Sequence, residues 1–419
     1  MTKRKNLKTM VRTLTALAMA IVACCWMTLT ALPAQAADYT PVYTAEDQFT
    51  SRDLKQTADL SGAKTLTVSS GSDILIDGAG VYVLSGTASG VTVRVEAPDD
   101  AKVQLVLDGL NLTNSDFPCI YVVSADKVFV TTSADSALSV TGTFRTDGTV
   151  KTDGVIFSRS DLVLNGTATL TISSSDVGVV SKDDLKVTGG VYDITAATKA
   201  FEANDSIRVA GGTFRLQAGT DGLHAENNDD DTLGYIYISG GDMTISAGDD
   251  GIHATSVLQI DGGNITISAK EGLEGTYIQI NDGTLNIQSW DDGINAARKS
   301  RSYQVNLEIN GGDLNIRMGA GDTDGVDSNG NLTVNGGIVN VTGSNTFDYD
   351  GSGVYNGGTI IANGQTLNTL PNQMMGGRGG MGGRGGQGGW GTQDSQGGWG
   401  SQGGWGSQGG WGGGGRRGR

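Results

Sequence analysis

The sequence predicts an all-β fold, a parallel β-helix in which coils of about 22 residues, with three short strands each, stack on one another. The first observation is an internal repeat: eight Gly-Gly or Asp-Gly pairs recur, with second glycines 22, 29, 22, 20, 29, 25 and 21 residues apart. The segments between the pairs alternate apolar and polar residues, which is the periodicity of strands. None of them has the length and spacing of an amphipathic helix. The pairs are Gly189-Gly190, Gly211-Gly212, Gly240-Gly241, Gly262-Gly263, Asp282-Gly283, Gly311-Gly312, Gly336-Gly337 and Gly357-Gly358.

The first 36 residues have the pattern of a secretory signal peptide. Five basic residues precede an apolar stretch over residues 13–32, and the small-residue site Ala34-Gln35-Ala36 follows. We therefore expect cleavage after Ala36 and a secreted or cell-surface protein. Two alternatives stay open, a membrane anchor made by the apolar stretch and a lipoprotein modified at Cys24, because residues 21–24 resemble a lipoprotein box.

Residues 37–59 form a lead-in, and residues 60–370 are expected to form the β-helix. One coil cannot bury its inward row of apolar side chains alone, so neighbouring coils must stack. Residues 60–165 repeat less regularly, and we expect N-terminal coils there with a cap that blocks end-to-end association. In the coil from Gly240 the inward row is Met243, Ile245, Ile252, Ala254, Leu258 and Ile260.

Residues 371–419 form a tail of different composition, in which Gly-Gly-Trp-Gly occurs four times among Gln, Ser and Arg. The tail has no residues with which to build a core, so we expect it to be disordered. Tryptophan rings at flexible intervals suit weak multivalent contact with glycans or cell-wall polymers.

Charge and cysteine content limit the partners and the sources of stability. Cys119 is the one cysteine outside the leader, so no intramolecular disulfide can form in the body. Residues 37–370 hold 19 basic and 44 acidic residues and carry a formal charge of −25. Such a surface repels nucleic acid and anionic membranes, and its natural counterparts are cations.

The middle turns of the coils place acidic residues in two columns. The first column consists of Asp221, Asp250, Glu271, Asp292, Asp324 and Asp350, each followed by glycine. The second consists of His224, His253, Glu274, Asn295 and Asp327. Rungs of a stacked sheet lie ~4.8 Å apart, and two like charges at that distance repel by up to ~3.5 kcal/mol at an effective dielectric of 20. A long column of carboxylates therefore needs a cation.

Calcium fits these columns because its oxygen ligands lie at ~2.3 to 2.6 Å, so ligands on opposite sides of one ion are separated by about the rung spacing. The alternative is that Asp-Gly serves only as turn chemistry. The two histidines are more simply explained as stacked outward side chains than as ligands of a transition metal. The expected calcium ligands are Asp221, Asp249 and Asp250; Glu271, Glu274, Asp291 and Asp292; and Asp322, Asp324 and Asp327.

A basic insertion beside the columns is a candidate sugar-binding site. Aromatic faces suit sugar rings and arginine suits uronate carboxylates, although a solvated loop is the alternative. The acidic insertion at residues 227–231 is better explained as a solvated loop than as a separate metal site. The candidate sugar-binding residues are Trp290, Arg298, Lys299, Arg301 and Tyr303.

Three segments carry a resemblance to a known family: Leu107 to Asn114, Ser181 to Gly190, and the Gly-Asp-Asp-Gly-Ile-His-Ala run from Gly248. Over about residues 55–365 the chain resembles the bacterial carbohydrate-binding domain family of secreted β-helix proteins, which look like pectate lyases in fold. The resemblance implies right-handed coils, bound calcium and affinity for plant polysaccharides, with acidic pectic chains as the leading candidate.

Three functions are consistent with these features. The favoured one is calcium-dependent, non-catalytic binding of an acidic plant polysaccharide at the cell surface or outside the cell. The first alternative is a calcium-dependent polysaccharide lyase in which Arg298, Lys299 or Arg301 abstracts the uronate C5 proton. The second is a surface adhesin, with the β-helix as a stalk and the tail as the adhesive part.

Overall fold

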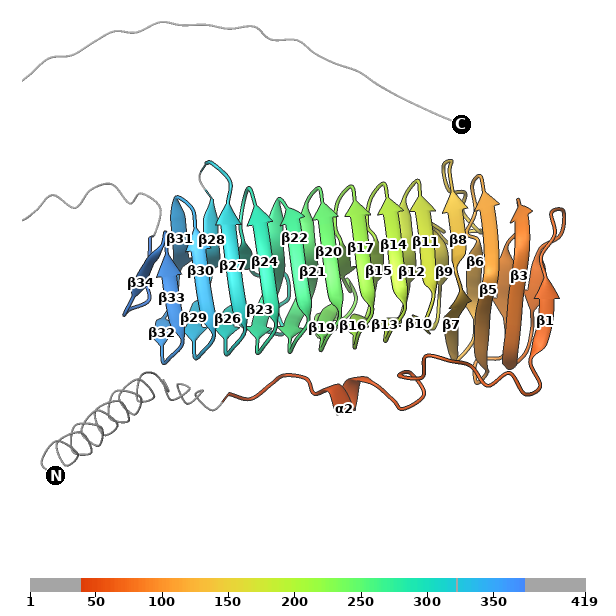
Figure 1. Cartoon of the computed structure of the whole chain (residues 1–419), viewed down its shortest axis with the longest axis horizontal. Helices are drawn as coiled ribbons and strands as arrows, with labels where there is room; N and C mark the ends of the chain where they lie inside the picture. Colours follow the sequence, from red (N-terminus) through yellow and green to blue (C-terminus); the bar gives the residue numbers. More distant parts are fainter. Residues whose placement is uncertain (1–38, 322, 374–419) are drawn as a thin grey trace, which may run out of the picture. The chain divides into compact units, whose positions relative to one another are not determined.

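The computed structural model describes residues 39–321 and 323–373 (Figure 1). These residues form one short helix, α2 (Ala45–Gln48), and strands β1 to β34, which pair into one long and mostly parallel sheet. The predicted all-β solenoid is confirmed at this level. The leader with its site after Ala36 and with Cys24, the residue Asp322, and the tail from residue 374 lie outside the described residues. No helix in the described ranges is long and apolar enough to cross a membrane.

The coils distribute their strands over three stacks of parallel strands. The first stack contains β8 (Ser136–Val140), β11 (Thr169–Ser174), β14 (Val191–Ala196), β17 (Thr213–Ala218), β20 (Asp242–Ala247), β22 (Asn264–Ala269), β24 (Thr284–Ser289), β27 (Asp313–Met318), β30 (Ile338–Thr342) and β33 (Thr359–Ala362), to which β34 (Gln365–Leu367) adds in antiparallel fashion. The second contains β2 (Ile74–Ile76), β4 (Val93–Glu96), β6 (Ile120–Ser124), β9 (Gly154–Ser158), β12 (Val177–Ser181), β15 (Phe201–Ala203), β18 (Leu223–Ala225), β25 (Ile294–Ala296), β28 (Asp324–Ser328) and β31 (Asn345–Tyr349).

The third stack contains β1 (Lys64–Thr67), β7 (Lys127–Ala134), β10 (Asp161–Gly166), β13 (Asp184–Val187), β16 (Ser206–Val209), β19 (Tyr235–Ile238), β26 (Asn306–Ile309), β29 (Asn331–Val334) and β32 (Gly353–Tyr355). Four long strands bend from one stack into another. β3 (Gly80–Ser89) and β5 (Lys102–Asn114) join the first and third stacks, and β21 (Asp250–Ile260) and β23 (Glu271–Ile280) join the second and third.

The glycine pairs lie at the turns between the third and first stacks, as the sequence predicts. The second glycine of each pair has a positive φ, for example +113° at Gly241, a conformation that side chains disfavour. A Cβ on Gly241 would also lie 3.2 Å from the carbonyl oxygen of Gly212 in the preceding coil. Glycine is therefore required both by the turn and by the close approach of the rungs.

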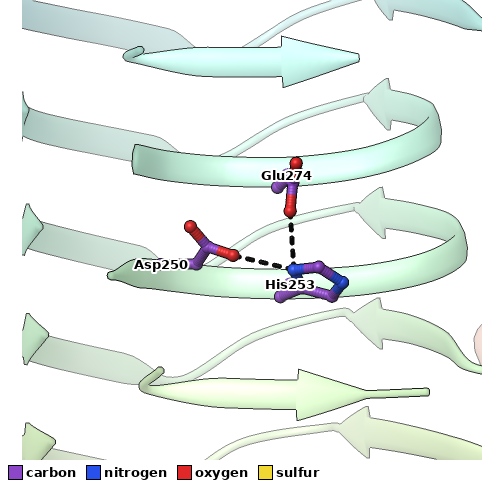
Figure 2. A group of neighbouring side chains, drawn as sticks. All are labelled: Asp250, His253 and Glu274. Atoms are coloured by element: carbon purple, nitrogen blue, oxygen red, sulfur yellow. Dashed lines mark hydrogen bonds and ion pairs between the residues drawn. The ribbon is translucent and has the colours of Figure 1, made fainter. Parts of the chain in front are cut away.

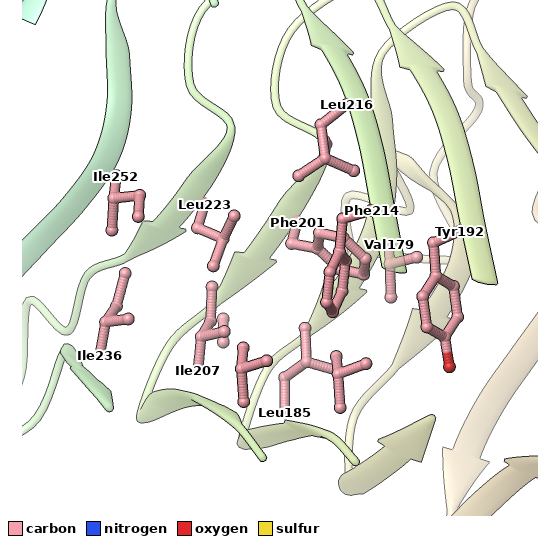
Figure 3. Close-up of a cluster of buried hydrophobic side chains, with 14 of the residues drawn as sticks. Val179, Leu185, Tyr192, Phe201, Ile207, Phe214, Leu216, Leu223, Ile236 and Ile252 are labelled. Atoms are coloured by element: carbon pink, nitrogen blue, oxygen red, sulfur yellow. The ribbon is translucent and has the colours of Figure 1, made fainter. Parts of the chain in front are cut away.

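The core is a column of apolar side chains inside the three stacks (Figure 3). Equivalent side chains of successive coils lie above one another, as in Leu185, Ile207 and Ile236 of the third stack. Tyr192 and Phe214 stack in the same way, with ring centroids 5.4 Å apart. All six residues of the inward row predicted for the coil from Gly240 are at most 2% exposed, so the predicted strand alternation is confirmed there.

A ladder of asparagine side chains ties the turns that precede the glycine pairs. Asn310 donates to the Oδ1 of Asn281 at 2.8 Å, Asn335 donates to Asn310 at 2.6 Å, and Asn356 donates to Asn335 at 2.7 Å. Asn281, Asn310 and Asn335 are buried, where water does not reach their amide groups. Each amide group therefore forms a hydrogen bond with the asparagine of a neighbouring coil.

The lead-in lies along the outside of the third stack, where Figure 1 shows it passing beneath the coils with α2 near its middle. We call residues 39–57 the strap. Tyr43 stacks on Tyr235 with ring centroids 4.5 Å apart, and its backbone N–H donates to Gln259 at 2.8 Å. Further along, Asp53 is 1% exposed and accepts a hydrogen bond from the buried Lys186 at 3.2 Å. The strap thus joins coils that are far apart in the sequence.

Candidate functional site

The two acidic columns lie on the outer side of the second stack, which we call the acidic face. Asp250 pairs in register with Glu271, and the series from His224 through His253, Glu274 and Asn295 to Asp327 is continuous. The predicted alignment is therefore confirmed over these coils.

The alignment is wrong at Asp350. Asn345 pairs with Asp324, and Asp348 takes the next place after Asp327 in the second column. The reason is that β31 begins only three residues after β30 ends, so Asp350 falls beyond β31, in the turn toward the third stack. The signal for Asp348 was present in the sequence, but the repeated Asp-Gly pair placed Asp350 in the first column, five residues beyond Asn345, the residue that pairs with Asp324.

The glycines that follow the first column are explained by packing and not by turn geometry. A Cβ on Gly251 would lie 2.6 Å from the carbonyl oxygen of Gly272, and one on Gly272 would lie 2.3 Å from that of Gly293. These three glycines are absent from the positive-φ positions. Turn geometry therefore does not explain these glycines.

In the coils of β18, β21 and β23, the carboxylates lie beside histidine and lysine side chains. The Nδ1 of His224 lies 2.8 Å from Asp221, and the two histidine rings stack with centroids 4.6 Å apart. Figure 2 shows that the Nδ1 of His253 faces both Asp250 and Glu274, at 2.7 Å from each. Lys299 also makes an ion pair with Glu274.

This pairing sets the charge state of the cluster. Burial opposes the ionisation of Glu274, but hydrogen bonds from His253 and Lys299 outweigh it and lower the pKa of Glu274 to about 2. Burial likewise opposes a charged His253, but hydrogen bonds to Asp250 and Glu274 raise the pKa of His253 to about 9. With Lys299 included, two basic side chains face the carboxyl groups of Asp250 and Glu274.

Lys270 is a further cation that the sequence analysis did not single out. Its Nζ lies 3.1 Å from Asp249 and 3.5 Å from Asp291, the two acids that double the first column. Lys270 takes the place immediately before Glu271, as Asp249 and Asp291 do before their own column acids. The register alone therefore contained the signal for this pairing.

Among the residues that the structure describes, Asp292, Asp327 and Asp348 of the coils of β25, β28 and β31 form no ion pair with a lysine, arginine or histidine. The pKa values of two of these carboxyl groups are raised. Burial first, and then the charges of Asp292, Asp324 and Asp348, raise the pKa of Asp327 to about 7. Burial and neighbouring acids also raise the pKa of Asp292 to about 6.

Two buried acceptor oxygens flank Asp327 in register. The Oδ1 of Asn295 and the Oδ1 of Asp348 have no hydrogen-bond partner among the residues that the structure describes. Oxygen acceptors therefore surround Asp327 in its own and the two adjacent coils, which is the chemistry of a hard-cation site. We call Asp292, Asn295, Asp324, Asp327 and Asp348 the oxygen cluster.

Of the other predicted ligands, Asp221, Asp249 and Asp250 do come together, since one ligand oxygen of each lies within 4.8 Å of the others. Glu271 lies between the two regions. Burial and the charges of Glu274, Asp250 and Asp292 raise the pKa of Glu271 to about 7, although Asn295 donates a hydrogen bond to it at 3.0 Å.

The two insertions, at residues 227–231 and 297–303, meet over the histidine pair. Ser300 donates its hydroxyl hydrogen bond to the backbone oxygen of Asp231 at 2.6 Å. Together they line a pocket, whose other lining residues include His224 and His253; Arg298 and Lys299 come from one insertion, and Asn227 and Asp231 come from the other. We call it the insertion pocket. Sequence reasoning treated the acidic insertion as solvated and did not bring the two together.

The other predicted sugar-binding residues lie elsewhere. Trp290 is 49% exposed and stands at the turn between the first and second stacks, against Gly319. Arg301 is exposed. Tyr303 packs on the aromatic cluster beneath the strap that includes Tyr235 and Tyr237.

Comparison with known proteins identifies the family of this chain. The model of a family described as carbohydrate-binding domain-containing protein matches residues 70–345 and 271–368. The chain belongs to this carbohydrate-binding domain family. A carbohydrate-binding domain-containing protein of Acetivibrio thermocellus is 30% identical over 129 residues, which is 30% of this chain and 45% of that relative, so the chain spans less than half of its length.

A solved structure is also similar, the gadolinium derivative of a polysaccharide lyase-like protein from C. thermocellum. It is 30% identical, the match covers 51% of this chain and 87% of that one, and the TM-score is 0.46. Membership of the carbohydrate-binding domain family agrees with the resemblance stated from the sequence.

Proposed function

We propose that this member of the carbohydrate-binding domain family is a secreted, non-catalytic protein that binds acidic polysaccharide and holds calcium on its acidic face. The family supports a polysaccharide partner. Calcium, the acidic plant glycan and secretion through cleavage after Ala36 are our additions. We also propose right-handed winding of the roughly 22-residue coils, because parallel crossover connections are almost always right-handed.

The oxygen cluster is the observation that carries the calcium assignment. Its members offer carboxylate and amide oxygens, which are the ligands that calcium prefers. Asn295 Oδ1 and Asp348 Oδ1 are buried acceptors without a donor in the described part of the chain, and a cation would satisfy them. When bound, calcium supplies positive charge that offsets the repulsion among these acids. Asp322 is a further predicted ligand, adjacent in sequence to this cluster.

The insertion pocket is the proposed contact for the glycan. Arg298 is exposed at its rim and suits the planar carboxylate of a uronate residue. Asn227 and Glu226 also line the pocket and offer hydrogen-bond partners for sugar hydroxyl groups. Tyr303 does not line this pocket, because its ring packs beneath the strap.

The lyase alternative requires an unprotonated base, and the contacts of Lys299 argue against it in that role. Burial disfavours its charge, but the hydrogen bond to Glu274 outweighs burial and raises the pKa of Lys299. Lys299 therefore keeps its proton at neutral pH. Arginine is a poorer base still.

The proposal is tested by electrophoresis of the mature protein in native gels that contain polygalacturonate, with calcium or with EGTA. We expect retardation in calcium that EGTA abolishes and that Arg298→Ala weakens at least tenfold, while the exposed-arginine control Arg159→Ala behaves as wild type. Retardation that is unchanged by EGTA and by Arg298→Ala would contradict the proposal. Release of unsaturated uronides, seen as ultraviolet absorbance, would favour the lyase.

A further inference from the structure

The outer side of the first stack, from β11 to β30, is a regular array of polar side chains, which we call the polar face. Exposed and buried residues alternate strictly in β20 and β22, so each strand presents three side chains outward. Strand pairing places these side chains in rows, as with Thr244, Thr266 and Asn286. The strap lies on the third stack, so it leaves this face open (Figure 1).

The polar face differs in charge from the rest of the body. Its three rows between β11 and β30 contain the acids Asp193, Asp242 and Asp313 and the bases Arg215 and Arg317, a net charge of −1. The other outward positions are almost all Thr, Ser, Asn or Gln. On a body of −25, this near-neutral surface offers no attraction to a polyanion or a polycation. It offers many hydroxyl and amide groups that both donate and accept hydrogen bonds.

Two shallow grooves follow this face across the strands. One is lined by outward residues from Thr169 of β11 to Thr266 of β22, and the other by residues from Thr266 to Arg317 of β27. Thr266 lines both, so they join. At ~4.8 Å a rung, the seven strands from β11 to β27 give a track of roughly 29 Å, long enough for an extended chain of several sugar rings.

An aromatic side chain stands at the edge of this track. Asn286 and Gln288 are exposed on β24, and Trp290 follows two residues later with 49% of its surface exposed. It thus continues the outward alternation of β24 at the corner of the polar face. A tryptophan ring beside a row of amides offers a stacking surface for the apolar face of a sugar ring.

We propose that the polar face is a second glycan-binding surface, which takes an extended neutral polysaccharide along the solenoid axis. This rests on the proposed function in so far as both assume a glycan ligand. The second surface differs from the acidic face in position and in chemistry. Its hydroxyl and amide groups would form hydrogen bonds with neutral sugars without calcium, whereas binding at the acidic face is proposed to require the cation. Trp290, first considered for the acidic face, belongs to this surface.

The test is electrophoresis of the mature protein in native gels that contain hydroxyethyl cellulose, a soluble neutral polysaccharide. We expect retardation of the wild type in calcium and in EGTA alike. Thr266→Glu, which puts a charge where the grooves join, is expected to weaken the apparent affinity at least tenfold, and Trp290→Ala to weaken it severalfold. Thr342→Glu makes the same change on exposed β30, outside both grooves, and is expected to leave retardation unchanged.

Several outcomes separate this proposal from the previous one. Arg298→Ala is expected to affect polygalacturonate alone, and Thr266→Glu hydroxyethyl cellulose alone. Wild-type protein that is not retarded by the neutral polymer overturns the inference, even if polygalacturonate binding holds. Equal retardation of wild type, Thr266→Glu and Trp290→Ala overturns it as well. Melting curves of the variants show whether each is folded. If Thr266→Glu does not fold, Trp290→Ala, at an exposed turn, supplies the test.

Discussion

Replacing Asp327 with Asn is expected to raise the melting temperature of the metal-free protein and to reduce the stabilisation that calcium gives. The pKa of Asp327 is raised from 3.8 to about 7 by burial and by the surrounding acids. At ~1.36 kcal/mol per pKa unit this corresponds to about 4 kcal/mol against the ionised form. The side chain is half-buried, so solvent screens part of this energy, and we expect about 2 kcal/mol.

The sign depends on pH. A carboxyl group whose pKa is raised on folding binds its proton more tightly in the folded state, so stability falls as pH rises from about 4 to about 7. In EGTA at pH 8, Asp327→Asn should therefore melt about 2 to 4 °C above the wild type, and the difference should disappear near pH 4. In calcium the order should reverse, because the variant has lost a ligand charge.

The assay is thermal unfolding followed by circular dichroism at pH 4, 6 and 8, with EGTA and with calcium. Asp108→Asn, at an exposed position on β5, is the matched control and should change neither series. If Asp327→Asn melts below the wild type in EGTA at pH 8, then Asp327 is not under electrostatic strain and the reasoning fails.

Three further predictions concern the contacts around the site. His253→Gln should lower the free energy of unfolding by about 2 to 3 kcal/mol at pH 6.5. The reason is that a His pKa raised to about 9 contributes stability below pH 6.5 that is lost as pH rises through 9. Denaturant titrations that show an equally large loss at pH 10 would contradict this. Asn310→Ala breaks two bonds of the asparagine ladder and should cost about 2 to 3 kcal/mol, whereas Asn368→Ala, at an exposed position, should cost little in the same titration. Asp53→Asn leaves the buried Lys186 without its carboxylate and should cost about 3 to 5 kcal/mol and open the strap to limited proteolysis. The exposed Asp47→Asn on α2 is its control, and equal proteolysis of the two would show that the Asp53 pair does not hold the strap.

The stacking of coils was accessible from the sequence because it depends on local, repeated signals. The glycine pairs, the period-two alternation and the row containing Ile252 and Ile260 each follow from backbone geometry within one coil. Once coils are aligned, the neighbours of a column residue such as Glu274 follow from the register. The alignment failed at Asp350, because the first column continues to Asn345 at the start of β31, five residues before Asp350.

The charge balance of the acidic face was less accessible. The sequence shows the acids, but whether each is paired depends on long side chains that cross between coils, as Lys270 does toward Asp249 and Lys299 toward Glu274. The strap had no local signal, because its partners lie far along the chain; Asp53 meets Lys186 across 133 residues. The meeting of the two insertions over His253 is of the same kind, since neither loop indicates the conformation of the other.

Calcium titration by isothermal calorimetry tests the central claim most directly, namely that the oxygen cluster holds calcium. The mature protein, stripped with EGTA and dialysed, is titrated at pH 7.5 beside Asp327→Asn and the control Asp108→Asn. We predict saturable binding to the wild type and the control, weakened at least tenfold in Asp327→Asn, with protons released on binding because calcium displaces them from carboxyl groups whose pKa values are raised to about 6 and 7. Calcium binding of equal strength in wild type and Asp327→Asn, or none in the wild type, would contradict it.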